Sequence, residues 1–236
     1  LKLKIELRGR YAIATKNGNL RASKKKGPLS IYVLDTSALT DPRLKGILNA
    51  DDLDSTIKKI STLIAELRFQ LDLLFYTTPS MAGEMRRYLL SNGVSFETLG
   101  DLFSWIIVKS PDMLTTKIPA LIMSDYVQSI RLRSFRALRL MEDLLKRALK
   151  TDKNAATDEA YAELVHEARE KFREIMRKGI VDSPEDFDVL VLAYELKGSL
   201  VTNDDGIKKM AERMGIIAID PISFLEGLRR LKTMLS

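Results

Sequence analysis

The stretch that decides the fold is residues 31–39, IYVLDTSAL, in which a short apolar run ends at an aspartate. Apolar runs of this length are typical of strands that are buried on both faces of a parallel sheet. Four further runs follow, at 73–76, 105–108, 199–202 and 216–219. Because helical patterns separate these runs, the sequence predicts an α/β fold in which helices flank a parallel sheet. The shorter expected helices cover residues 54–71, 80–91, 184–196, 205–213 and 221–233.

The stretch from about 118 to 178 is too long for one crossover between neighbouring strands. Its apolar residues recur every three to four positions on both sides of a polar break at Thr151–Asn154. This pattern predicts two amphipathic helices that form an inserted αα-hairpin. Such an arm cannot bury both of its apolar stripes within itself. We therefore expect it to pack on the body or on another chain, and the protein to be at least a dimer.

The composition excludes several kinds of chemistry. The chain has no cysteine, which excludes disulfides and thiolate zinc sites, and its one histidine, His166, cannot build a multi-histidine site. His166 lies in a highly charged helical stretch and is expected to be exposed. No apolar run approaches the roughly 20 residues of a membrane span, and the first residues do not resemble a secretory signal. We expect a cytoplasmic protein without a membrane partner.

The charge balance favours a polyanionic partner such as nucleic acid, because 38 basic and 32 acidic side chains give a formal charge of +6. Residues 1–29 form a basic extension with turn residues at Asn17–Asn19 and a lysine run at Lys24–Lys26. This extension is either disordered or an arm that attracts phosphates. Residues 30–236 are expected to form one domain, which the helical hairpin interrupts.

Acidic residues stand at the ends of the expected strands or at the starts of helices. Ligands bind beyond the carboxyl ends of parallel strands, so these side chains are expected to meet there. Converging carboxylates need a counter-charge, and a hard divalent cation, Mg²⁺ or Mn²⁺, suits oxygen ligands best. Two such cations roughly 3.5–4 Å apart support phosphodiester hydrolysis that leaves a 5′-phosphate and a 3′-hydroxyl. The six acids are Asp35, Glu84, Asp182, Asp186, Asp204 and Asp205.

Several of these acids also have a simpler structural interpretation. Ser183 marks the start of a helix, where Asp186 complements the helix dipole. The sequence Asn203–Gly206 is typical of a turn. Glu84 lies among arginines on a helix and is the weakest candidate. Asp188 diverges from Asp186 on the same helix and is left outside the site.

The first helix of the hairpin is rich in arginine. Such a charge run is usually a solvated helix face, but beside an acidic hydrolytic site it favours binding of phosphates with a steep salt dependence. The candidates for RNA binding are Arg131, Arg133, Arg136, Arg139 and Arg147.

Together these motifs resemble a PIN domain. Its acidic signature is matched by LDTSAL around Asp35, by Glu84 after the second strand, by Asp186 ahead of Tyr194, and by VTND, which ends at Asp204. The segments YVLDTSALTDPRL, TTPSMAGEMRRYL, SPDMLTTKIPA and DSPEDFDVLVLAYELKGSLVTNDDGIKKMAERMGI, with the arginine-rich hairpin, are similar to the branch of homologues of Aquifex ribonuclease P. The resemblance covers about residues 30–235 and leaves the extension outside.

The resemblance implies an RNA-free ribonuclease P. Such an enzyme is a Mg²⁺-dependent endoribonuclease that removes the 5′ leader from precursor tRNA and leaves a 5′-phosphate on the mature tRNA. It also implies that the arm pairs subunits into dimers, which assemble into larger rings, and that arginines of the arm bind the tRNA. The implied catalytic acids are Asp35, Asp182, Asp186, Asp204 and Asp205, and the metal ligands are Asp35, Glu84, Asp186 and Asp204.

Two alternatives remain open. The first is a PIN ribonuclease with another RNA target, such as a tRNA loop or ribosomal RNA, although small toxin-like members lack such an arm. The second is a non-catalytic RNA-binding partner of an RNA-processing enzyme, which gains nothing from clustered acids that face RNA.

Overall fold

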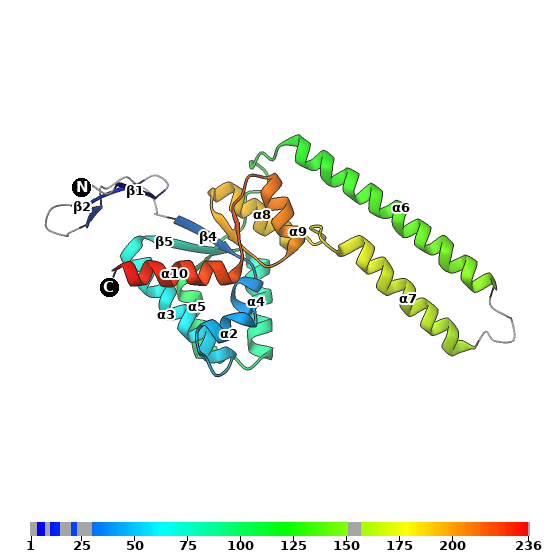
Figure 1. Ribbon diagram of the computed structural model, residues 1–236, viewed down its shortest axis with the longest axis horizontal. Coiled ribbons are helices and arrows are strands. Elements are labelled where there is room, and N and C mark those ends of the chain that lie inside the picture. The colour runs from blue at the N-terminus through cyan, green and yellow to red at the C-terminus, as the bar shows by residue number, and fades with distance from the viewer. Residues whose placement is uncertain (1–3, 8–9, 15–19, 23–29, 151–156, 236) are drawn as a thin grey trace.

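The computed structural model describes residues 4–7, 10–14, 20–22, 30–150 and 157–235, and their side chains from Ser30 onwards. Its body is a five-stranded parallel sheet between helices. A long helical hairpin projects from one end of this body, and a small antiparallel sheet lies at the other (Figure 1). The predicted α/β class, with a helix-flanked parallel sheet and an inserted hairpin, is confirmed.

The parallel sheet has the order β6-β5-β4-β7-β8. The chain builds β5 and β6 on one side of the central strand β4, and then β7 and β8 on its other side. Val33 of β4 therefore pairs with Tyr76 of β5 on one side and with Leu200 of β7 on the other. The carboxyl end of β4 is thus the point at which the strand order reverses, where α/β folds place their ligands. The strands are β4 (Ser30–Leu34), β5 (Leu73–Thr77), β6 (Ile106–Val108), β7 (Ser199–Val201) and β8 (Ala218–Ile219).

Helices cover both faces of this sheet. On one face, the ring of Phe224 packs against Tyr32 and Phe75, with centroids 5.2 and 6.3 Å away. On the other face lies α8, whose residues 189–193 are all buried because strands and helices surround it. These helices are α3 (Leu53–Leu71), α4 (Pro79–Ser91), α5 (Phe96–Trp105), α8 (Pro184–Leu196), α9 (Asp205–Arg213) and α10 (Pro221–Leu235).

Three helices have no counterpart in the sequence-based prediction. The helices α1 (Ser37–Thr40) and α2 (Arg43–Ile47) are too short to show a helical period. The third is α5, which begins at an N-cap, Ser95, whose hydroxyl accepts a hydrogen bond from the Thr98 N–H at 3.2 Å. A serine before an apolar run is a recognised signal for the start of a helix, so the sequence contains enough information to predict α5.

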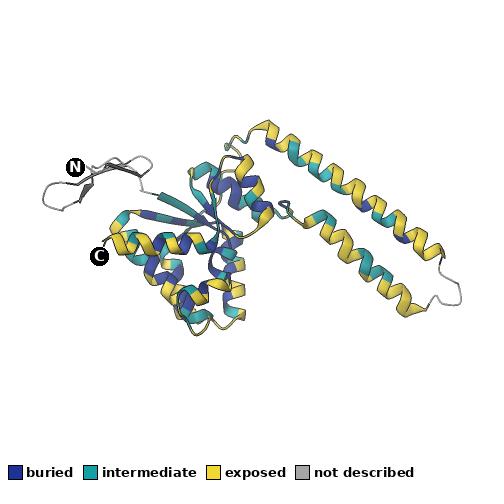
Figure 2. Ribbon diagram, in the orientation of Figure 1, coloured by how far each residue is buried: buried dark blue, intermediate teal, exposed yellow. Residues whose placement is uncertain are grey.

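The arm consists of α6 (Ala120–Lys150) and α7 (Asp158–Arg177), which pack against each other and project away from the body (Figure 1). Most residues of the arm are exposed, and most of the others are half-buried (Figure 2). Only three residues of α6 and none of α7 are buried. A stripe of apolar side chains on α6 is exposed, which we call the outer stripe: Leu132, Phe135, Leu138, Leu145 and Leu149. The predicted break at Thr151–Asn154 lies outside the described residues.

The N-terminal extension contains the antiparallel strands β1 (Lys4–Leu7), β2 (Arg10–Ala14) and β3 (Leu20–Ala22). They pair in chain order. The sequence does not predict this sheet, because alternation over so few residues is a weak signal. The predicted turn at Asn17–Asn19 and the lysine run Lys24–Lys26 lie outside the described residues. None of the helices that the structure describes is both long enough and apolar enough to cross a bilayer.

Candidate active site

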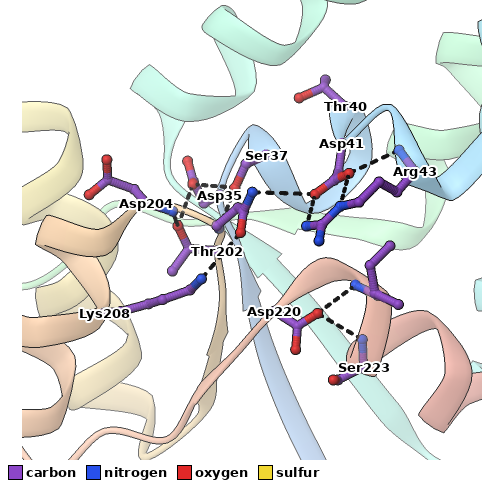
Figure 3. Close-up of polar contacts among 12 residues, drawn as sticks. Asp35, Ser37, Thr40, Asp41, Arg43, Thr202, Asp204, Lys208, Asp220 and Ser223 are labelled. Carbon is purple, nitrogen blue, oxygen red and sulfur yellow. Dashed lines mark hydrogen bonds and ion pairs between the residues drawn. The ribbon is translucent and has the colours of Figure 1, made fainter.

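Asp35 follows the central strand β4 and is only 6% exposed. Three neutral donors fix its carboxylate, and Figure 3 shows two of them, Ser37 and Thr202. The Thr36 N–H donates to Oδ1 at 2.6 Å, while the hydroxyls of Ser37 and Thr202 donate to Oδ2 at 2.8 and 2.7 Å. The Asp35 side chain is therefore held in one orientation by segments 167 residues apart.

The same environment leaves the charge of Asp35 uncompensated. Burial raises the pKa of its carboxyl above the ordinary value, and the negative charge of Glu84 raises it further. The hydrogen bonds from Thr202, Ser37 and Thr36 oppose this rise because they favour the ionised form. Since none of these donors carries a charge, an ionised Asp35 favours a nearby cation.

Asp204 lies beyond the neighbouring strand β7, at the N-cap of α9. Its Oδ1 accepts a hydrogen bond from the Ile207 N–H at 2.8 Å, and its own N–H donates to the Thr202 hydroxyl at 3.1 Å. Thr202 therefore contacts both Asp35 and Asp204 and links the loops that follow the two strands (Figure 3). Asp205 is exposed in the first turn of α9.

Asp186 lies in the first turn of α8, and its N–H donates to the hydroxyl of the N-cap Ser183 at 3.1 Å. Its pKa is raised to about 6, first by burial and then by the charges of Asp35, Asp204 and Asp182. Asp186 therefore has two roles: it lies in the capped first turn of α8, and its carboxylate interacts with the other acids of the site. The structure brings Asp35 and Asp204, from two distant segments, within electrostatic reach of Asp186. Asp186 also has Asp182 nearby in its own segment.

A cleft of about 530 Å³ lies between the starts of α4 and α8 and the end of α7. Asp182 lines it and is ion-paired with Arg177, the last residue of the arm. Asp188 does not line it, as expected. The lining residues are Pro79, Ser80, Gly83, Glu84, Arg87, Arg177, Asp182, Ser183, Glu185 and Asp186. The sequence interpretation omitted Arg87 and Arg177 from the site, although the position of Arg87 one helical turn beyond Glu84 was a usable signal.

A second polar network supports the loops around Asp35. The Ser37 hydroxyl accepts a hydrogen bond from the Asn203 N–H at 2.8 Å, so Ser37 joins the β4 loop to the β7 loop. The Asn203 side chain in turn contacts Asp41, whose carboxylate accepts hydrogen bonds from Arg43 Nε at 2.9 Å and Nη2 at 2.5 Å (Figure 3). The Arg43 guanidinium lowers the pKa of Asp41. Because Asp41 has its own counter-ion, we assign it a structural role.

The chemistry of this donor set fits a hard divalent cation, since it consists of carboxylate oxygens and its innermost member is buried without a counter-ion. Within the described part of the chain, no three acidic side chains already lie close enough together to form a complete ligand set. That arrangement is compatible with Mg²⁺, which usually keeps several waters and contacts one or two carboxylates.

The arm arginines fall into two groups. Arg133 donates to the carbonyls of Ile175 at 2.5 Å and Lys178 at 2.9 Å and so joins the two helices near the base of the arm. Arg147 makes two hydrogen bonds to Glu167, at 2.7 and 3.0 Å, and lowers the pKa of that carboxyl to about 2 together with Lys171.

The other three arginines face solvent. Arg131 lies 5.7 Å from the centre of the Phe135 ring, whereas Arg136 and Arg139 make no hydrogen bond or ion pair within the described residues. His166 is exposed, as its charged surroundings predict.

Comparison with known proteins identifies the family. Residues 31–233 match the family model described as PINc domain ribonuclease. A relative from Staphylothermus marinus named RNA-free ribonuclease P is 44% identical, over 84% of this chain and 94% of its own length. Relatives of the same name from Hyperthermus butylicus and Aeropyrum pernix are 41% and 36% identical, each over 86% of this chain and over 90% and 92% of their own lengths. The chain therefore belongs to the PIN-domain ribonucleases, in the branch of the RNA-free ribonuclease P proteins, and is an endoribonuclease.

Proposed function

We propose that this endoribonuclease removes the 5′ leader from precursor tRNA in the cytoplasm, with the help of Mg²⁺ or Mn²⁺. The observation that carries the proposal is the pair of fixed carboxylates, Asp35 and Asp204, which Thr202 joins at the reversal point of the sheet. The membership of the ribonuclease P branch supports the choice of substrate.

We assign the residues of this site to two roles, binding of the cation and positioning of its ligands. Asp35, Asp186 and Asp204 would hold the cation, with Glu84 facing it from α4. When bound, a divalent cation activates water and neutralises charge that develops on the phosphate. Ser37 and Thr202 fix the orientation of the Asp35 side chain, and capping of α9 fixes that of Asp204. Asp182 lines the cleft, where Arg177 balances its charge, and Asp205 is exposed in the first turn of α9.

The test is incubation of the purified protein with a precursor tRNA and Mg²⁺, followed by sequencing of the RNA ends. We expect one cut at the 5′ end of the mature tRNA, which leaves a 5′-phosphate there, and no cut in EDTA. A cut within a tRNA loop or in ribosomal RNA alone would favour the first alternative. Binding without turnover would favour a non-catalytic RNA-binding partner.

The arm is proposed to contact the tRNA through its exposed arginines. Replacing Arg136 and Arg139 together with glutamine should weaken precursor tRNA binding, because each lost phosphate contact removes about one released counterion. We expect about a tenfold increase in Kd and a shallower salt dependence. Both side chains lack partners within the described residues, so the melting temperature should not change. Wild-type affinity in the double variant would contradict an RNA-binding role for these two arginines.

The arm is also proposed to pair two copies of the chain, and the pairs to assemble further. Supporting this, the outer stripe exposes large side chains, for example Leu145 at 64% and Leu149 at 86%, at helical spacing and away from the body. Exposed apolar surface of this kind typically marks a protein interface. A monomeric mass at micromolar concentration, measured by light scattering, would overturn this part of the proposal.

A further inference from the structure

Two neighbouring arginines on α4 have different surroundings. The guanidinium carbon of Arg86 lies 4.3 Å from the centre of the Phe103 ring, so Arg86 packs on α5. Arg87 points into the cleft, with Nη1 3.7 Å from the place where a Cβ on Gly83 would lie. The Arg87 side chain thus runs back over Gly83 at van der Waals distance.

Arg87 also differs from the other cation of the cleft. Arg177 forms an ion pair with Asp182. Arg87, by contrast, makes no hydrogen bond or ion pair within the described part of the chain, and this includes Glu84 one turn away. The cleft lining contains four carboxylates and two guanidiniums, a formal charge of −2. A lining with this net negative charge repels an RNA strand unless cations neutralise the charge of the phosphates that enter the cleft. A divalent ion held near Asp35 and Asp186 would neutralise one phosphate, and the guanidinium of Arg87 is available for another.

We propose that Arg87 binds a phosphate next to the scissile one and so positions the RNA strand in the cleft. This inference rests on the proposed function. A guanidinium suits the role because its planar fork matches two phosphate oxygens at once. Arg86, whose ring contact holds it outside the cleft, offers a matched control on the same helix.

The experiment compares the steady-state kinetics of R87Q, R87K and R86Q on a precursor tRNA. R87Q should raise KM about tenfold and change kcat little, because a contact to a non-reacting phosphate stabilises bound substrate and transition state alike. R87K should recover part of the loss, since lysine keeps the charge but not the fork. R86Q should match the wild type. Equal KM values for R87Q and R86Q would overturn the inference.

Substrates with a single uncharged methylphosphonate identify the phosphate. Moving this group through the positions around the cut should reveal one position at which the wild type loses about as much as R87Q does. At that position R87Q should lose nothing further, because the two changes remove the same contact. If instead the losses add at every position, Arg87 contacts no phosphate there and the inference fails.

The two proposals fail in different ways. If the wild type removes the leader but R87Q has the same KM as R86Q, the proposed function is supported and the proposed role of Arg87 is wrong. If the wild type does not cut precursor tRNA at the leader, the function falls, and the same variants are then compared on the RNA that this endoribonuclease does cut. An unchanged KM for R87Q on that RNA overturns the inference there as well.

Discussion

Replacing Asp35 with asparagine should abolish RNA cleavage and leave RNA binding nearly intact. The substitution removes the buried charge that attracts the cation, and loss of a principal electrostatic group in an active site costs on the order of 10³-fold in rate. The fold should tolerate it, since the hydroxyls of Ser37 and Thr202 can rotate to accept hydrogen bonds from the new amide. Because burial raises the pKa of Asp35, its ionised form destabilises the fold, and the melting temperature of D35N should not be lower than that of the wild type.

The measurement is the single-turnover rate on precursor tRNA, beside Kd from a filter-binding assay. D188N is the control, because Asp188 is a half-buried carboxylate on α8 that does not line the cleft. It should cleave at nearly the wild-type rate. Full activity in stringently purified D35N would remove the argument for a metal site at the end of β4.

Gly206 of α9 should be intolerant of any side chain. A Cβ at this position would lie 2.5 Å from the carbonyl oxygen of Ile180, 2.6 Å from its carbonyl carbon and 2.8 Å from its nitrogen. These are backbone atoms, so either the loop after the arm or the first turn of α9 has to move. We expect G206A to lower the free energy of unfolding by about 3 kcal/mol, the upper end for overpacked sites. Cleavage should also fall, because the first turn of α9 positions Asp204.

G100A provides the comparison for this substitution. Gly100 lies within α5, and a Cβ there has no neighbour within 4 Å. Alanine at an open helical position should stabilise the fold by about 0.5–1 kcal/mol. Chemical denaturation of both variants measures the contrast. If G206A unfolds at the same denaturant concentration as the wild type, α9 and the Ile180 loop do not pack as closely as described.

The sequence was informative wherever a local pattern determined the structure. The five apolar runs gave the strands of the parallel sheet, and the three-to-four spacing gave both helices of the arm. The acids of the site can be predicted because each stands at a strand end or a helix start, and both have local sequence signals. Asp186 is an example. The serine, proline and acidic residues that begin α8 are a local start signal, and this helix start brings the Asp186 carboxylate near Asp35 and Asp204.

Other features depend on contacts between distant segments and leave no local signal. The hydrogen bond from Thr202 to Asp35 joins residues that only the sheet brings together, and the Asp41–Arg43–Asn203 network is of the same kind. The sequence presents the arm arginines as one charge run, but Arg133 and Arg147 bind groups across the hairpin, whereas Arg136 and Arg139 do not. Arg86 and Arg87 are neighbours in the sequence, yet Arg86 packs on Phe103 whereas Arg87 lines the cleft, and no periodicity predicts this difference.

The two strands at the margins of the parallel sheet are very short, three residues in β6 and two in β8. Few backbone N–H and C=O groups are therefore left open along either border. Intermolecular β-sheet pairing needs a long exposed edge strand, and neither edge of this sheet provides one. Edge-to-edge association through the parallel sheet is therefore disfavoured, whereas the outer stripe of α6 offers apolar side chains for pairing.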